Sequence, residues 1–351
     1  MRIAIGIGTG TEDWAGAAAF VQEAERLGVD IAWSAETWGH DAATPIGFMA
    51  AKTSRMRLGT GIIQTAARSP ANIAMIGMTL ASMSGDRFTL GLGASGPQVV
   101  EGWHGVPFKG ALQRLRETVD IVRIISRGER LVYNGDYFTL PLPGGEGKAL
   151  KTGAQPREFP IYLATLSPKS LRVTGEIADG WIGTSFMPEH AEVFLAHLRT
   201  GAESAGRTLA DLDLQVAAGV VEFGDDIAKL VEPRKGGLAF SLGAMGSAQH
   251  NFYNDAYKRA GYDEIARKVQ ATWLEGRRDE ARAMVPDEMV LKTNLIGTPD
   301  MVKERIRVHA RAGVNTLNVM AGGRTLSERV ENLGRFMELV KEVGAEPVAA
   351  R

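Results

Sequence analysis

One local pattern recurs along this chain and restricts the folds that are open to it. A short apolar run is followed, after a few residues, by a helix start that carries proline just inside. These starts are Thr44-Pro45, Ser69-Pro70, Ser167-Pro168, Met187-Pro188 and Thr298-Pro299. Proline fits the first turn of a helix because the amide hydrogen that it lacks has no partner there. A repeated strand–loop–helix unit is typical of parallel α/β folds.

Counting these units predicts that the sheet closes into a barrel. Eight apolar runs are predicted to be strands, and they are apolar almost throughout, as in strands that are covered on both faces. Their predicted ranges are 2–7, 30–34, 57–63, 87–92, 160–164, 179–184, 213–223 and 315–320. The fold class is therefore α/β, and we predict a (β/α)8 TIM barrel rather than an open sheet.

Two stretches exceed the eightfold pattern. Residues 128–158 contain the alternating run LVYNGDYFTL, in which Asn134-Gly135 is a strong hairpin signal. Residues 224–297 follow the seventh strand and carry several predicted helices. Insertions of this length after barrel strands usually build or cover a ligand site. Since no Pro/Gly/Ser-rich linker and no second core is evident, we predict one domain over residues 1–351.

Composition excludes several classes of function. A formal net charge of −1 with interspersed signs gives no electrostatic footprint for nucleic acid or an anionic membrane. The absence of cysteine excludes disulfides, thiolate metal sites and a cysteine nucleophile. The histidines are scattered and do not stand at metal-ligand spacing. No apolar run reaches the roughly 20 residues of a membrane span, and no signal peptide is evident, so we expect a soluble cytoplasmic protein.

Gly91, Gly93 and Gly96 spell G-x-G-x-x-G at the end of the fourth predicted strand. A dinucleotide-binding fingerprint needs a helix that starts on these glycines, and no helix pattern resumes here until about Ala111. The glycines are then either a permissive loop or positions where the backbone approaches a ligand closely at the barrel mouth. We favour the ligand-binding interpretation.

The predicted C-terminal ends of the strands are rich in glycine and hydroxyl groups and poor in charge. Glu36 is the carboxylate among them, so hydrolysis by paired carboxylates is not supported. Small residues and backbone amides suit a flat aromatic cofactor with a phosphate, which Ser95, Gly96 and the helix start at Ser167 would bind. Such a cofactor would supply the chemistry for which the side chains provide few groups.

Several segments, taken in order, resemble the luciferase-like flavin and deazaflavin oxidoreductases over about residues 1–340. They are GTGII, ARSPANIAM, DRFTLGLGASG, VVEGWHGVPF, IYLAT, ADGWIGTSF and GTPDMVKERI. The sequence is most similar to the branch that uses coenzyme F420, which includes methylenetetrahydromethanopterin reductase and F420-dependent glucose-6-phosphate dehydrogenase.

The resemblance implies a cofactor site. In F420-using members the third strand ends in a non-prolyl cis peptide behind the deazaflavin ring, and the matching bond here is Gly61–Ile62. The phosphate loops of the family fall on two short runs, Ala94, Ser95 and Gly96, and Thr165, Leu166 and Ser167. The acid/histidine pair of the dehydrogenases falls on Ala35 and Glu36, and their phosphate-binding lysine has no counterpart near residues 186–190. Glucose 6-phosphate is therefore a disfavoured substrate.

Glu36 and His104 are the candidate catalytic residues. Glu36 is either an acid/base beside the ring or a solvated loop carboxylate, and His104 either faces the substrate or caps a loop. Trp38, Phe186 and Met245 are candidate pocket walls or ordinary core side chains. Arg234 and Lys235 are candidates to pair with the acidic tail of F420 or form a solvated charged turn.

These observations predict an F420-dependent oxidoreductase that moves a hydride between C5 of the deazaflavin and a small organic substrate. One alternative is an FMN-dependent luciferase-like monooxygenase on the same scaffold. Another is a flavin-binding barrel without turnover. The resemblance also implies a homodimer.

Overall fold

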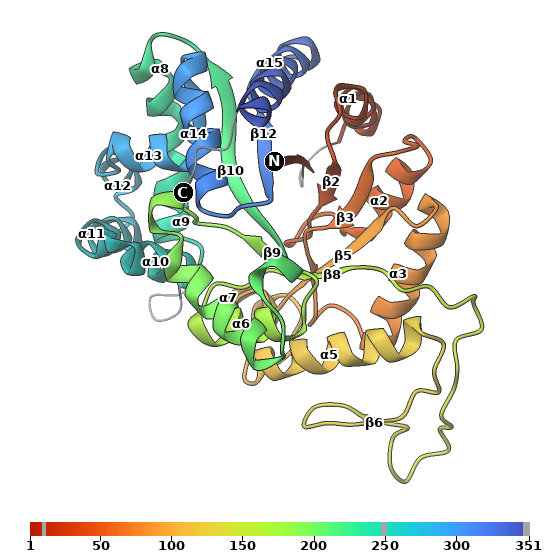
Figure 1. Ribbon diagram of the computed structural model, residues 1–351. Coiled ribbons are helices and arrows are strands. Elements are labelled where there is room, and N and C mark those ends of the chain that lie inside the picture. The colour runs from red at the N-terminus through yellow and green to blue at the C-terminus, as the bar shows by residue number, and fades with distance from the viewer. Residues whose placement is uncertain (9–11, 247–250, 347–351) are drawn as a thin grey trace.

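The computed structural model describes residues 1–8, 12–246 and 251–346. Within these residues, eight parallel strands form a closed barrel with helices around it, which confirms the predicted fold (Figure 1). In barrel order the strands are β1 (Arg2–Ile7), β2 (Ile31–Ser34), β3 (Arg57–Thr60), β5 (Phe88–Gly93), β8 (Ile161–Leu163), β9 (Gly180–Gly183), β10 (Asp213–Phe223) and β12 (Thr316–Ala321).

Two short strands extend this sheet. β4 (Ile63–Gln64) continues the line of β3 and pairs with β5, so the third predicted strand is interrupted at residues 61 and 62. β11 (Leu295–Gly297) was not predicted, and it adds to the end of β10 outside the closed ring.

Helices connect the strands and cover the barrel from outside (Figure 1). Those of the repeated units are α1 (Trp14–Leu27), α2 (Ala43–Ala50), α3 (Pro70–Ser84), α5 (Ala111–Ser126), α6 (Pro168–Ile177), α7 (Glu192–Ser204), α14 (Pro299–Arg311) and α15 (Leu326–Ala345). The shorter ones are α4 (Pro97–Gly102), η1 (Pro188–His190) and η2 (Leu209–Asp211).

The predicted helix starts are mostly confirmed. Ser69, Ser167 and Thr298 are N-cap residues whose hydroxyls accept from the backbone, and proline follows each of them. Pro188 opens the short η1 helix instead of a long one. α2 begins at Ala43, two residues before its proline, because the Asp41 carboxylate accepts from the first backbone amides.

The glycines of β5 let the neighbouring strand approach. A Cβ on Gly91 would lie 1.9 Å from the Thr60 carbonyl oxygen. In its absence the Thr60 hydroxyl donates to the Gly91 carbonyl and accepts from the Gly91 amide. A Cβ on Gly93 would meet the Ile62 side chain at 2.3 Å. The first two glycines of G-x-G-x-x-G therefore serve strand packing.

The segment after Gly96 differs from the prediction. A short helix, α4, begins directly after that glycine, whereas no helix was expected before about residue 111. Proline at its first position and the Gly96 carbonyl, which accepts from Val99 and Val100, account for it. Because the helix joins a closed barrel and not an open doubly wound sheet, the dinucleotide fingerprint still does not apply.

The first insertion contains the predicted hairpin, β6 (Tyr133–Asn134) with β7 (Thr139–Leu140). Its turn spans residues 135–138 and centres on Asp136 and Tyr137, two positions later than the Asn-Gly signal indicates. The reason is Glu117 of α5, whose buried carboxylate accepts from the amides of Asp136, Tyr137 and Phe138.

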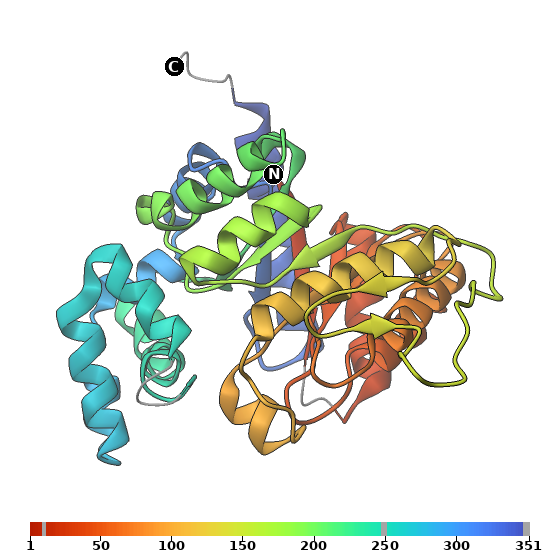
Figure 2. The ribbon, with the colours of Figure 1, turned by 90° about the horizontal axis from the view of Figure 1, so that it is seen from below.

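The second insertion is helical. It comprises α8 (Ile227–Val231), η3 (Glu232–Arg234), α9 (Lys235–Gly243), α10 (Phe252–Tyr257), η4 (Lys258–Tyr262), α11 (Asp263–Leu274), α12 (Arg278–Ala283) and α13 (Asp287–Thr293). These helices stand beside the barrel in Figure 2 and enclose an apolar cluster of their own, contrary to the expectation of no second core. The single domain stays a prediction.

Among the described residues, no helix combines the length and the apolar character that crossing a membrane requires.

Candidate functional site

The bond between Gly61 and Ile62 is a non-prolyl cis peptide, as predicted. It lies where β3 ends and β4 begins, at the C-terminal end of the barrel strands. The Gly61 amide donates to the Ser34 carbonyl at 2.7 Å, and a Cβ on Gly61 would lie 3.2 Å from the Trp33 ring. Both residues of the bond are half-buried.

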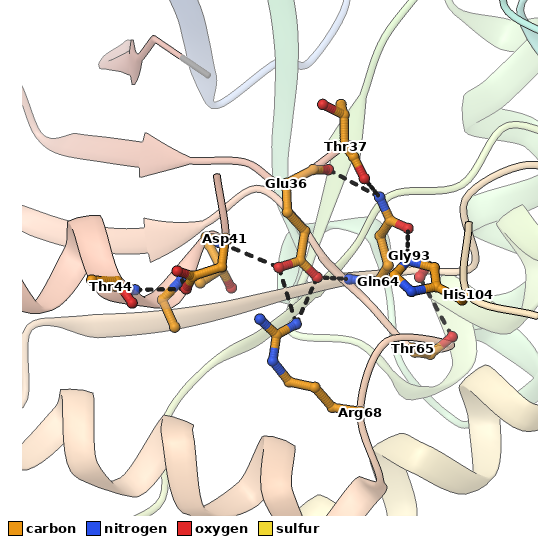
Figure 3. Close-up of polar contacts among 12 residues, drawn as sticks. Glu36, Thr37, Asp41, Thr44, Gln64, Thr65, Arg68, Gly93 and His104 are labelled. Carbon is orange, nitrogen blue, oxygen red and sulfur yellow. Dashed lines mark hydrogen bonds and ion pairs between the residues drawn. The ribbon is translucent and has the colours of Figure 1, made fainter. Parts of the chain in front are cut away.

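Glu36 holds the segment that follows this bond. Its backbone amide donates to the Ile62 carbonyl at 3.2 Å, and its carboxylate accepts from the Gln64 amide at 2.7 Å. The same carboxylate pairs with Arg68 through both oxygens, at 2.7 and 3.0 Å, and accepts from the Ala42 amide (Figure 3). The Glu36 side chain is 8% exposed. It is therefore a buried, ion-paired group and not a solvated loop carboxylate.

Gln64 connects two loops of the site (Figure 3). Its side-chain amide nitrogen donates to the carbonyls of Glu36 and Thr37, at 3.2 and 2.9 Å. Its side-chain oxygen lies 3.0 Å from Nε2 of His104. Gln64 is 2% exposed, and His104 is half-buried. The two predicted catalytic residues thus belong to one hydrogen-bonded network.

The predicted phosphate loop after β5 includes a hydroxyl group without a partner in the described part of the chain. Ala94, Ser95 and Gly96 are half-buried, and Ser95 has a left-handed backbone with φ of 60°. Among the described residues, none pairs with the Ser95 hydroxyl. A non-glycine residue in this conformation is uncommon and marks a position that its surroundings or its function impose.

Some polar groups of the predicted loop after β8 already form hydrogen bonds within the protein. The Thr165 hydroxyl lies 2.7 Å from that of Thr174, behind the loop, and the Ser167 hydroxyl and amide form a capping box with Ser170. The Leu166 carbonyl accepts at 2.7 Å from Arg259, which comes from the second insertion. A ligand at this loop would therefore meet backbone groups and a guanidinium more than hydroxyls.

Arg259 is a cation that forms no close ion pair with a described residue, although the Asp255 carboxylate attracts it from a greater distance. Of the residues that the structure describes, none places a carboxylate within ion-pair distance of its guanidinium. Burial lowers its pKa below the ordinary value. A half-buried cation beside a backbone loop suits an anion such as phosphate or carboxylate.

Other candidate side chains lie elsewhere. Phe186 is 1% exposed and packs on Trp181 and Phe194, so it belongs to the core. Arg234 pairs with Glu222, and Lys235 lies 2.7 Å from the Asp287 carboxylate, so neither is a solvated or free cation.

Two other candidates for pocket walls do not join the network. Trp38 is 58% exposed, although it follows Thr37 directly. Met245 is half-buried in the second insertion. Their role as pocket walls stays a prediction.

Sequence reasoning missed Arg68, Arg259 and the part that Gln64 takes. Arg68 stands in the segment ARSPANIAM, one residue before a helix cap, and nothing in the sequence links it to Glu36. Gln64 directly follows the third predicted strand, and its sequence context indicates no role. Arg259 comes from a distant insertion, and nothing in the sequence links it to residue 166.

Comparison with known proteins places this chain in a family. The profile of the family described as luciferase-like monooxygenase matches residues 1–316. A Mycobacterium tuberculosis protein named as a coenzyme F420-dependent oxidoreductase is 39% identical over 329 residues, which cover 91% of this chain and 94% of that protein. The 5,10-methylenetetrahydromethanopterin reductase of Archaeoglobus fulgidus is 28% identical over 86% of this chain and 88% of its own.

A solved structure has the same fold. The coenzyme F420-dependent tetrahydromethanopterin reductase of Methanopyrus kandleri superposes with a TM-score of 0.78 at 24% identity. The match covers 95% of this chain and 97% of the other. At 24% identity the similarity establishes a shared fold only.

Proposed function

Because the chain belongs to the luciferase-like family, we propose that it is an F420-dependent oxidoreductase that transfers a hydride between the cofactor and a small organic substrate. The observation that carries the proposal is the loop at residues 94–96, where the half-buried Ser95 hydroxyl has no partner among the described residues and which lies at the same barrel mouth as Gly61 and Ile62. The M. tuberculosis relative, which is named for this cofactor, supports it.

The residues present fit F420 at both ends of the cofactor. Ser95 and Gly96 would bind the phosphate, and Arg259 beside Leu166 would pair with an anionic oxygen of the phosphate or of the acidic tail. Gly61 and Ile62 would support the deazaflavin ring from behind. Once bound, F420 supplies a C5 atom that accepts or releases a hydride.

The two candidate catalytic residues take different roles in this proposal. His104 is the group that would exchange a proton with the substrate, since its ring is half-buried and has one nitrogen outside the network. Glu36 would act as a positioning residue, because its carboxylate is already engaged by Arg68 and two backbone amides. It thereby holds the segment after the cis bond in place.

Cofactor binding tests the proposal directly. Purified protein is titrated against F420 and, separately, FMN, with quenching of cofactor fluorescence as the measurement. We expect saturable quenching of F420 at micromolar or lower concentrations and at least tenfold weaker binding of FMN. Tight FMN binding without F420 binding would favour a flavin monooxygenase on this scaffold.

Turnover separates an enzyme from a carrier. With oxidised F420, loss of its absorbance on addition of an alcohol or aldehyde panel reports hydride transfer to the cofactor. With reduced F420, recovery of that absorbance on addition of an unsaturated substrate panel reports transfer in the opposite direction. Binding of F420 with no turnover in either direction would support a flavin-binding barrel without catalysis.

A further inference from the structure

The contacts of Gln64 determine which way its side-chain amide faces. Two backbone carbonyls, those of Glu36 and Thr37, lie 3.2 and 2.9 Å from the same end of this amide. A carbonyl oxygen only accepts hydrogen bonds, so the end that faces them is the NH2 group. The opposite end, which faces His104, is therefore the oxygen.

The amide orientation in turn determines the protonation of His104. The Gln64 oxygen only accepts, and it lies 3.0 Å from Nε2 of the imidazole. Nε2 must then carry the hydrogen. In a neutral ring the other nitrogen, Nδ1, has the free lone pair.

We propose that Gln64 is a positioning residue that fixes His104 as the Nε2–H tautomer, and that Nδ1 is the ring atom through which His104 exchanges a proton with the substrate. When Nδ1 accepts a proton from a substrate O–H or N–H, a bond forms to its lone pair and the ring becomes imidazolium. The Nε2–H bond to Gln64 stays intact in both states. The use of Nδ1 in turnover rests on the proposed function, whereas the tautomer is a property of the chain alone.

Gln64 is held firmly enough for this role. Its backbone amide donates to the Glu36 carboxylate at 2.7 Å, and that carboxylate is neutralised by Arg68. Residue 64 also pairs with Gly93 in the β4–β5 ladder. The side chain is thus anchored through its own strand and through the two carbonyls, and rotation of the amide would break both of those bonds.

Nitrogen NMR on the full-length protein with 15N-labelled histidine measures the tautomer. The wild-type protein should show a His104 ring with a protonated Nε2 and an unprotonated Nδ1, and the His104→Gln variant identifies its signals. His309 is an internal reference, because its ring is expected to be the other tautomer. Its Nδ1 lies 2.8 Å from the Arg305 carbonyl, so this buried ring should be the Nδ1–H tautomer in the same spectrum.

Two substitutions at position 64 distinguish the role of the side-chain oxygen of Gln64 from that of its NH2 group. Gln64→Leu removes the acceptor, and His104 should lose its single tautomer and give exchange-averaged signals. Gln64→Glu keeps an acceptor for Nε2 but loses the donor to the two carbonyls, so the Nε2–H tautomer should be retained. Gln22→Leu is the matched control, because the Gln22 amide donates to the Lys52 carbonyl on the outside of α1.

A protonated Nδ1 on neutral His104 in the wild-type protein would overturn the proposal, whether or not the variants fold. An unchanged tautomer in Gln64→Leu, with the His309 signals intact, would also overturn it. F420 titration of the same samples distinguishes this failure from that of the proposed function. Wild-type protein that does not quench F420 removes the proposed function and leaves the tautomer assignment standing.

Discussion

The charged and polar side chains at the barrel mouth have different kinds of partner in its two halves. At the ends of β2 to β5, Glu36 and Arg68 neutralise each other in a buried pair, and neutral groups such as Gln64 connect that pair to the site. At the ends of β8 and β9, polar groups of the second insertion bond to uncharged partners. Arg259 donates to a carbonyl, and a hydrogen bond from Ser185 opposes the burial that raises the pKa of Tyr257 to about 12.

The difference indicates that the first half stabilises the backbone and that the second half binds the ligand. The Glu36–Arg68 ion pair exists before any ligand binds, so it holds the backbone in place. A half-buried cation that donates only to a carbonyl forms a stronger, charge-assisted hydrogen bond when an anion binds beside it. We therefore expect substitutions in the first half to change stability and substitutions in the second half to change binding or pH response.

The largest effect is expected from Glu36→Gln. Arg68 would remain in a mostly buried position without its carboxylate, which costs about 4 kcal/mol in the free energy of unfolding. Urea denaturation measures it. The matched control is Glu192→Gln, which breaks an exposed pair with Arg199 and should cost less than about 1 kcal/mol. Equal losses in the two variants would show that the mouth pair does not stabilise the protein in this way.

His309 should make the second half sensitive to acid. Burial lowers the pKa of His309 to about 4, against 6.5 for an ordinary histidine, while Arg305 and Glu189 face it with opposing effects. Between these values the unfolded chain binds a proton that the folded protein does not, so stability falls as the pH falls. From pH 7 to pH 5 this single group should remove about 2 kcal/mol.

The measurement is urea denaturation at both pH values for wild type and His309→Gln. Glutamine keeps a donor for the Arg305 carbonyl and does not titrate, so the variant should lose about 2 kcal/mol less than wild type over this interval. Other titrating groups contribute equally to the two proteins. Parallel pH curves would mean that His309 is protonated in the folded state or is solvated.

The barrel was predictable from the sequence because its signals are local and repeated. Apolar runs, hydroxyl caps and prolines each specify one strand or one helix start, and eight such units leave few closed arrangements. The features that the sequence predicts at the wrong position are those that depend on residues far away in the chain. The hairpin turn lies two positions late because the carboxylate of Glu117, from another element, accepts from three of its amides.

The site was predictable only in part for the same reason. The resemblance to a family placed the cis bond at Gly61–Ile62, which the structure confirms. The state of Glu36 required Arg68, which is 32 positions away. The contact between Arg259 and Leu166 spans 93 positions and has no sequence signal. The position of the cis bond was therefore recoverable from the sequence, whereas the partners of Glu36 and Leu166 were not.

Arg259→Met should affect the binding of one end of the cofactor only. If the guanidinium pairs with the phosphate or acidic tail of F420, its removal should weaken F420 binding about tenfold, or about 1.4 kcal/mol. Binding of the truncated deazaflavin F0, which lacks both phosphate and tail, should be unchanged. Fluorescence titration of both compounds measures the ratio. Arg267→Met, in the same insertion and paired with Asp263 on the surface, should leave both affinities unchanged.

The change in F420 affinity relative to the change in F0 affinity tests whether the second half of the mouth binds the anionic end of the cofactor. An equal loss for F420 and F0 would mean that Arg259 supports the loop at Leu166 and does not meet an anion. No loss for either would place the anionic end of the cofactor elsewhere. Partial recovery in Arg259→Lys, with a stronger dependence on salt, is expected because lysine keeps the charge but not the fixed geometry of the guanidinium.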